Sequence, residues 1–341
     1  MVVGLLYRRL ALALAFAVTG CAAPWAGSTP AVRLVDGTRS SASRSFLYVA
    51  SSGGRGTITV YQTGTQRRLS TIKSGPAFPR SILVDASGTL YVPYWGGIRV
   101  FSGRDKTFER TIITGTSAPF ALALDAQQNL FVANNNGAPD GSVSVYSPGG
   151  RRLSRRIVNG IAQPVALTFD KDENLYVANR PLDSVPPSIA IFRKNASKPV
   201  RTVRAGVATP YAIAVDAKET LYVLNGGNVE VYPARRTYPS QTITSGIQSA
   251  HALAIDGSGK LYVGNAGSVT VYQPGSTIVY RTLKVPAQTT ALAFDGDGRL
   301  YVATAMRRGT VFVYTSNLRP MLKIGASQGV RNPNSIALGV Y

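Results

Sequence analysis

Residues 119–134 read PFALALDAQQNLFVAN and contain the pattern that decides the fold. The apolar run at residues 121–124 leads into Asp125, and the triplet Leu-Phe-Val begins five residues later at Leu130. Two short apolar runs separated by a turn rich in Asp, Asn or Gly are typical of paired antiparallel strands. The stretch therefore predicts two strands joined by a tight turn that starts at Asp125.

The same pattern recurs along most of the chain. Leu-Tyr-Val, or a close variant, begins at Leu47, Leu90, Leu130, Leu175, Leu221, Leu261 and Leu300. Six copies have an Asp five residues earlier, namely Asp85, Asp125, Asp170, Asp216, Asp256 and Asp295. Each triplet is followed by a β-branched pair that ends in an aromatic residue: Tyr61, Phe101, Tyr146, Phe192, Tyr232, Tyr272 and Tyr314. A period of about 42 residues with four strand-like segments per copy predicts a β-propeller.

The two ends of the repeat complete each other. The copy at Leu47 has no innermost strand before it, and the last innermost strand, at residues 333–338, has no triplet after it. We therefore expect residues 334–341 to pair with the N-terminal strands and close the ring. The sequence predicts an all-β fold over residues 45–341, a monomeric seven-bladed β-propeller of four-stranded antiparallel blades.

The first residues have the layout of a signal peptide. Arg8 and Arg9 precede an apolar stretch at residues 10–18 that is too short to span a bilayer. Val18-Thr-Gly-Cys21 resembles the lipobox of bacterial lipoproteins, and Cys21 is the only Cys in the chain. This resemblance implies a signal peptide at residues 1–20, a lipidated Cys21, a flexible tether over residues 21–44, and an exported protein anchored at the periplasmic face or the cell surface. An ordinary signal peptide cleaved near residue 22 or 23 is the alternative.

Composition agrees with blades that are buried on both faces. The net charge is +21, yet only 16% of residues are charged and 45% are hydrophobic, which argues against disorder. The basic residues should lie around the outer rim rather than in one cluster with stacking aromatics, which argues against a nucleic-acid site. They would keep edge strands soluble, and attraction to anionic envelope surfaces is the alternative role. The rim residues are Arg67, Arg68, Arg151, Arg152, Arg155, Arg156, Lys194, Lys198, Arg201, Arg235, Arg236, Arg281 and Lys323.

The motif Pro-x-Ala-Leu-Ala-Leu-Asp-x-x-x-x-Leu-Tyr-Val-x-Asn resembles NHL-type repeats and the wider group of lactonase-like propellers, gluconolactonases and streptogramin lyases. The resemblance implies a functional face formed by the starts of the innermost strands and the ends of the second strands. A protein, glycan or small molecule would bind at the central mouth on that face. The Asn residues at strand ends have a second interpretation, in which they hydrogen-bond their own backbone turns. The candidate ligand-binding residues are Arg80, Phe120, Tyr211, His251, Asn134, Asn179, Asn225, Asn265 and Asn334.

Catalytic residues are sparse. Resemblance to gluconolactonases implies a central divalent cation, for which Asp140 and Asp183 are the carboxylates expected in loops on that face; calcium prefers six to eight oxygen ligands. Resemblance to streptogramin lyases implies a His base, and His251 is the only His. No cofactor is required, and the pattern favours a binding or scaffold module of the cell envelope over an enzyme. A metal-dependent lactonase- or lyase-like hydrolase is the first alternative, and adhesion to anionic surfaces through the basic rim is the second.

Overall fold

The computed structural model describes residues 45–52, 56–73, 79, 81–102, 105–135, 141–181, 185–305 and 309–340. These residues form β-strands and two short 3-10 helices, η1 (Pro148–Gly150) and η2 (Ala326–Gln328). The prediction of an all-β chain built from antiparallel four-stranded sheets is confirmed. The predicted signal peptide, Cys21 and its tether, and the candidates Arg80, Asp140 and Asp183 lie outside the described residues. Within the described part of the chain, no helix is long and apolar enough to cross a membrane.

Five sheets contain four strands each, and all their pairings are antiparallel. The first has the order β27 (Pro333–Val340), β1 (Ser45–Ser51), β2 (Thr57–Gln62) and β3 (Arg68–Lys73). The second comprises β4 (Leu83–Val84), β5 (Leu90–Tyr94), β6 (Gly97–Ser102) and β7 (Thr107–Ile112). The third comprises β8 (Pro119–Leu124), β9 (Leu130–Asn134), β10 (Ser142–Tyr146) and β11 (Leu153–Ile157).

The next two sheets repeat this plan. They comprise β12 (Pro164–Phe169), β13 (Leu175–Asn179), β14 (Ser188–Phe192) and β15 (Arg201–Val203), then β16 (Ala212–Val215), β17 (Leu221–Leu224), β18 (Val229–Tyr232) and β19 (Gln241–Ile243). The remaining sheet contains β20 (Ala252–Ile255), β21 (Leu261–Gly264), β22 (Ala266–Tyr272), β23 (Val279–Phe294), β24 (Leu300–Ala305), β25 (Thr310–Tyr314) and β26 (Pro320–Ile324).

The long strand β23 explains why the last sheet has seven strands. Its residues 279–284 pair with β22, and its residues 288–294 pair with β24. The first half is thus the fourth strand after β20, β21 and β22, while the second half is the first strand before β24, β25 and β26. One strand therefore serves two successive four-stranded sets.

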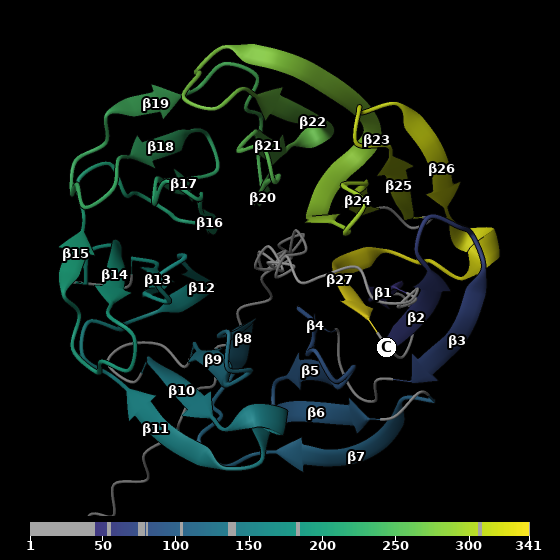
Figure 1. The fold of residues 1–341 in the computed structure, drawn as a ribbon, viewed down its shortest axis with the longest axis horizontal. Helices are drawn as coiled ribbons and strands as arrows, with labels where there is room; N and C mark the ends of the chain where they lie inside the picture. Colours follow the sequence, from purple (N-terminus) through teal and green to yellow (C-terminus); the bar gives the residue numbers. More distant parts are fainter. Residues whose placement is uncertain are drawn as a thin grey trace, which may run out of the picture.

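The sheets follow one another in chain order around a common centre (Figure 1). The first strand of each set lies nearest the centre, and the fourth strand lies outermost. Because all strands within a set are antiparallel, the starts of the first strands and the ends of the second strands share one end of the molecule. This end is called the mouth end below, and the turns after the first and third strands form the opposite, turn end.

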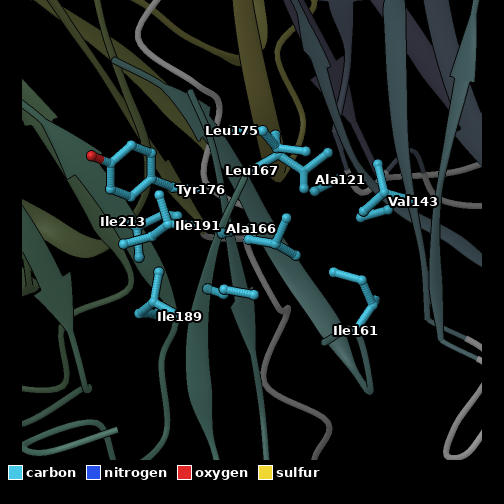
Figure 2. Packing of buried hydrophobic residues seen from close by; sticks show 14 of the residues in the cluster. Ala121, Val143, Ile161, Ala166, Leu167, Leu175, Tyr176, Ile189, Ile191 and Ile213 are labelled. Carbon is cyan, nitrogen blue, oxygen red and sulfur yellow. The ribbon is translucent and has the colours of Figure 1, made fainter. Parts of the chain in front are cut away.

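Hydrophobic clusters fill the spaces between neighbouring sheets. In the largest cluster, Ala121 and Val143 of the third sheet pack with Ala166 of the fourth, and Ile189 of the fourth packs with Ile213 of the fifth (Figure 2). The fourth sheet is therefore covered on both faces, by the third sheet on one side and the fifth on the other. This two-sided burial accounts for the nearly continuous apolar runs in the sequence, and the small Ala residues of the inner strands allow close approach.

The two ends of the described chain pair with each other. β27 is antiparallel to β1, with Leu47 opposite Leu338. Ile336 packs in one cluster with Ala303 and Val311 of the preceding set, whereas Ala337 packs in another with Val84 of the second sheet. Two hydrogen bonds add to these contacts: the Tyr61 hydroxyl donates to the Gln328 carbonyl (2.8 Å), and the Gly64 N–H donates to the Tyr301 hydroxyl (2.9 Å).

The repeat Asp residues cap the turns at the turn end, as predicted. Asp85 Oδ1 accepts hydrogen bonds from the Ser87 and Thr89 N–H groups, and its Oδ2 accepts one from the Tyr91 hydroxyl (2.9 Å). In the third sheet, where Phe131 replaces this Tyr, the Asp125 Oδ2 accepts from the Asn129 amide instead. Since burial raises the pKa of the Tyr91 hydroxyl, this group remains a donor. The equivalent Tyr hydroxyls that also bond a repeat Asp are Tyr176, Tyr222, Tyr262 and Tyr301.

Candidate functional site

Three successive sheets bring Arg180, Tyr211 and His251 together at the mouth end. The guanidinium carbon of Arg180 lies 4.5 Å from the centroid of the Tyr211 ring, which is within cation–π range. The Tyr211 and His251 ring centroids are 5.0 Å apart with an interplanar angle of 67°, an edge-to-face contact. These three residues are called the mouth row below, and all three are half-buried.

Backbone hydrogen bonds hold the mouth row in place. Arg180 directly follows β13, its N–H donates to the Gln163 carbonyl, and its Nε donates to the Pro210 carbonyl (3.1 Å) of the next sheet. Tyr211 precedes β16 and donates its N–H to the Leu224 carbonyl (2.8 Å). His251 precedes β20 and donates its N–H to the Gly264 carbonyl (3.0 Å). The row is therefore built on strand ends rather than on loop tips.

Gln288, at the start of the second half of β23, extends the row. Its side chain lies beside His251, and its Nε2 donates to the Ser249 carbonyl (3.1 Å). Ser249 has φ +46°, in the left-handed region that a non-glycine residue seldom adopts. Gln288 thus places an amide side chain from the next strand set near His251.

Burial sets the charge states of the row. It lowers the pKa of Arg180 to about 10, so this guanidinium is still a cation at neutral pH. Burial also lowers the pKa of His251, and the nearby Arg180 charge lowers it further, whereas the polar Gln288 side chain raises it. The His251 Nδ1 atom is buried and has no hydrogen-bond partner among the described residues. The row therefore presents a partly desolvated cation beside a neutral imidazole.

Few carboxylates of the described residues lie at the mouth end. Among the described carboxylates, Glu230 is the one that approaches this end; it is 6% exposed, and its two oxygens accept hydrogen bonds from Asn228 and Thr242. Asp105 and Glu109 belong to the outer part of the second sheet. The others lie in first-to-second-strand turns at the turn end: Asp85, Asp125, Asp170, Asp172, Glu173, Asp216, Glu219, Asp256, Asp295 and Asp297.

The four Asn residues at the ends of the second strands are used inside the fold. Asn265 is 0% exposed; its Oδ1 accepts from the Gln248 N–H (3.0 Å), and its Nδ2 donates to Thr270 Oγ1 (2.8 Å) and to the Gly246 carbonyl (3.2 Å). Gly246 and Gln248 belong to the segment that connects β19, the outermost strand of the preceding sheet, to β20, the first strand of the set that contains Asn265. The interpretation that each Asn bonds its own turn is corrected accordingly, because the partners lie 17 and 19 residues upstream. Asn134, Asn179 and Asn225 make the corresponding bonds.

The other candidates fall in different places. Phe120 is 8% exposed and belongs to the largest hydrophobic cluster, so its ring contributes to packing between sheets rather than to an open mouth. Asn334, in β27, accepts a hydrogen bond from the Ser52 hydroxyl (3.2 Å) and is 7% exposed. Asp140 and Asp183 lie outside the described residues, and the described residues contain no group of three or more His, Cys, Asp or Glu side chains that could hold a metal ion.

Sequence reasoning missed three residues at this end. Arg180 and Gln288 lie beside Tyr211 and His251, and Trp95, in the turn between β5 and β6, is 76% exposed. Arg180 could have been found from the sequence. It directly follows Asn179, the last residue of the second strand in its sheet, and that position adjoins the first strand of the next sheet. Comparison of the chain with models of known protein families gives no match, and comparison with curated proteins gives none either.

Proposed function

We propose that this chain is a seven-bladed β-propeller that acts as a lipid-anchored binding module of the cell envelope, and that the mouth row binds a small organic anion. Five four-stranded sheets, together with the two sets that share β23, make seven blades. The pairing of β27 with β1, and the packing of Ile336 and Ala337 against opposite neighbours, support a closed ring.

One observation carries the binding function: a half-buried guanidinium stacks on an aromatic ring, at an end where the one carboxylate among the described residues, Glu230, is internally bonded. A guanidinium is suited to bind carboxylate or phosphate oxygens through paired hydrogen bonds. Desolvation strengthens such a contact because the local dielectric is lower than that of water. The Tyr211 and His251 rings would contact the apolar part of the ligand. The ligand class is therefore a carboxylate or phosphate ester with an organic body.

The neutral His251 gives the hydrolase alternative its one specific support. A neutral imidazole whose Nδ1 has no partner in the described part of the chain can accept a proton from water or substrate. Binding is the better-supported function, since no described carboxylate lies beside this imidazole to orient it.

The test uses His251 itself as the reporter. It is the only His in the chain, so its imidazole proton signals in an NMR spectrum need no assignment, provided that the protein carries no His tag. We expect citrate, used as the probe anion, to shift these signals saturably in the wild-type protein. Arg180→Gln should weaken this response at least tenfold, because charge-assisted hydrogen bonds to the anion are lost. Inorganic phosphate serves as a second probe.

Arg204→Gln is the matched control. Arg204 is also a cation near the mouth end, but it is exposed and follows the outermost strand β15. Its removal should leave the citrate response unchanged. If both variants lost the citrate response equally, the response would depend on general positive charge and not on Arg180. If the wild-type protein responded to neither anion, the anion site would be contradicted.

Membrane attachment through Cys21 is tested separately. Cys21→Ala should move the protein from the membrane fraction to the soluble fraction, because stable anchoring needs the acyl chains. Ser41→Ala, which changes the predicted tether but not the Cys, should leave the protein with membranes. A Cys21→Ala protein that still fractionates with membranes would refute the lipoprotein hypothesis.

A further inference from the structure

Exposed cations gather in the turns between the third and fourth strands at the turn end. These turns occupy residues 63–67, 147–152, 193–200, 233–240 and 315–319, and together with the adjoining Arg68 they are called the basic turns below. Their exposed cations are Arg67, Arg68, Arg151, Arg152, Arg193, Lys194, Lys198, Arg235, Arg236 and Arg319. Only Arg151 and Lys194 form ion pairs with carboxylates of the described residues. The basic turns thus present unneutralised positive charge.

The carboxylates of the first-to-second-strand turns at the same end lie nearer the centre and are largely satisfied, whereas Asp105, in the outer turn of the second sheet, is exposed. Asp85, Asp170 and Asp295 are each 6% exposed and are hydrogen-bonded within their turns. The more exposed Asp172 and Asp297 pair with Lys171 and Arg299. Exposed cations in five outer turns therefore lie outside the buried or paired carboxylates of the inner turns, and an anionic surface would meet the cations there.

Exposed apolar side chains also stand among these turns, and the two most exposed are Tyr238 and Ile278. Tyr238, in a basic turn of the fifth sheet, is 73% exposed, and Ile278, in the corresponding turn before β23, is 76% exposed. The two regions are neighbours, because the Gln241 Nε2 donates to the Gly275 carbonyl. Exposed aromatic and aliphatic residues beside cations are typical of surfaces that contact a lipid interface.

The described chain also begins at this end. Ser45 lies beside the first basic turn, where its carbonyl accepts hydrogen bonds from the Thr63 N–H (3.2 Å) and hydroxyl (3.0 Å). Residues 22–44 connect Cys21 to Ser45. An anchor at Cys21 would therefore join the domain at the basic turns rather than at the mouth end.

We propose that the basic turns dock on anionic lipid headgroups, with Tyr238 and Ile278 at the interface, so that the mouth row faces away from the membrane. The orientation rests on the proposed lipid anchor, but the docking surface does not, because its charge and its exposed side chains belong to the described domain. Docking would leave the mouth row open to soluble ligands, while the anchor and the cations hold the opposite end.

The docking experiment uses the chain from residue 22 to 341, which contains every described residue and carries no lipid. We expect this protein to cosediment with vesicles of phosphatidylglycerol and phosphatidylcholine but not with phosphatidylcholine alone, and to be released as salt rises. Arg235→Gln with Arg236→Gln should weaken binding by about 25-fold, since each cation near an anionic surface contributes about fivefold.

Arg204→Gln with Lys284→Gln is the control pair, because both are exposed cations toward the mouth end and lie outside the basic turns. Circular dichroism of each variant checks that the fold is retained. Equal losses in the two pairs, or no binding to anionic vesicles, would overturn the docking surface. Neither result would bear on the citrate response at His251, so the two proposals fail separately.

Orientation is tested by quenching with brominated phosphatidylglycerol. Trp25 and Trp95 are the only two Trp residues, so in a Trp25→Phe protein the emission comes from Trp95 near the mouth end. We expect vesicles to leave this emission unquenched and to quench the emission that Tyr238→Trp adds. Quenching of Trp95 would overturn the orientation.

Discussion

Deletion of residues 332–341 is expected to abolish the cooperative unfolding transition of the whole domain. The deletion removes β27, which is the innermost strand of the first sheet and the antiparallel partner of β1. It also removes Ile336, which is 0% exposed, and Leu338, which is 7% exposed. Burial of side chains of this size contributes about 1.5–3 kcal/mol each, and the paired backbone groups of β1 would lose their partners. Domains are stable by only about 5–15 kcal/mol, so the combined loss is decisive.

The measurement is urea unfolding followed by circular dichroism, and the control is rescue. A synthetic peptide of residues 332–341 added to the truncated protein should restore a cooperative transition, because it can pair with β1. A truncated protein that unfolds with the midpoint and slope of the intact chain would contradict the closed ring. Failure of the peptide to rescue would count against pairing with β1 as the reason for the loss.

Asn265→Ala is expected to destabilise the protein by about 4 kcal/mol, an unusually large effect for one polar residue. The substitution removes the acceptor for the Gln248 N–H and the donor for both Thr270 Oγ1 and the Gly246 carbonyl. Asn265 is 0% exposed, so water cannot readily replace these bonds. Each buried polar group left without a partner costs about 1–3 kcal/mol.

Asn225→Ala is the matched control, because Asn225 has the same position in the neighbouring sheet and makes the same bonds, to the Ala208 N–H and the Gly206 carbonyl. It is half-buried, so water can replace the lost partners, and we expect a loss of about 1–2 kcal/mol. Urea unfolding gives both values. Equal losses for the two variants would contradict the role assigned to burial, and a loss of less than about 1 kcal/mol in Asn265→Ala would show that its bonds do not carry the stability assigned to them.

Strand pairs and turns were predictable from the sequence because their determinants are local. The Asp85 turn and the triplet at Leu90 lie within a few residues of each other, and the same spacing recurs in every strand set except the first, whose first strand comes from the C-terminal end. Charge placement was predictable for the same reason, since cations such as Arg67 and Arg235 occupy equivalent turns.

Contacts between sheets were harder to predict, because they join residues that no short spacing relates. Arg180 follows the second strand of the fourth sheet and Tyr211 precedes the first strand of the fifth, so they meet only because these sheets are neighbours. Gln288 reaches His251 from the second half of β23, which the sequence pattern assigns to the next strand set. Repeat position alone also did not show that Phe120, a candidate for the mouth, packs in the cluster between sheets. The Asn residues were placed correctly at strand ends, but their partners, such as the Gln248 N–H, belong to the turn entering from the preceding sheet.

The charge state of His251 also links the site to stability. Since the fold lowers the His251 pKa below 6.5, the ordinary value, protonation is harder in the folded protein than in the unfolded chain. The corresponding contribution to the free energy of unfolding is complete above pH 6.5, and it is lost as the pH falls through the folded-state pKa.

The central claim is that three successive sheets bring Arg180, Tyr211 and His251 to one end of the molecule. The most direct test is the His251 pKa, measured by NMR titration in the wild-type protein and in Arg180→Gln. We predict a wild-type pKa below 6.5 that rises when the Arg180 charge is removed, while Arg204→Gln leaves it unchanged. A wild-type pKa of 6.5 that is the same in all three proteins would contradict the arrangement on which the proposed function depends.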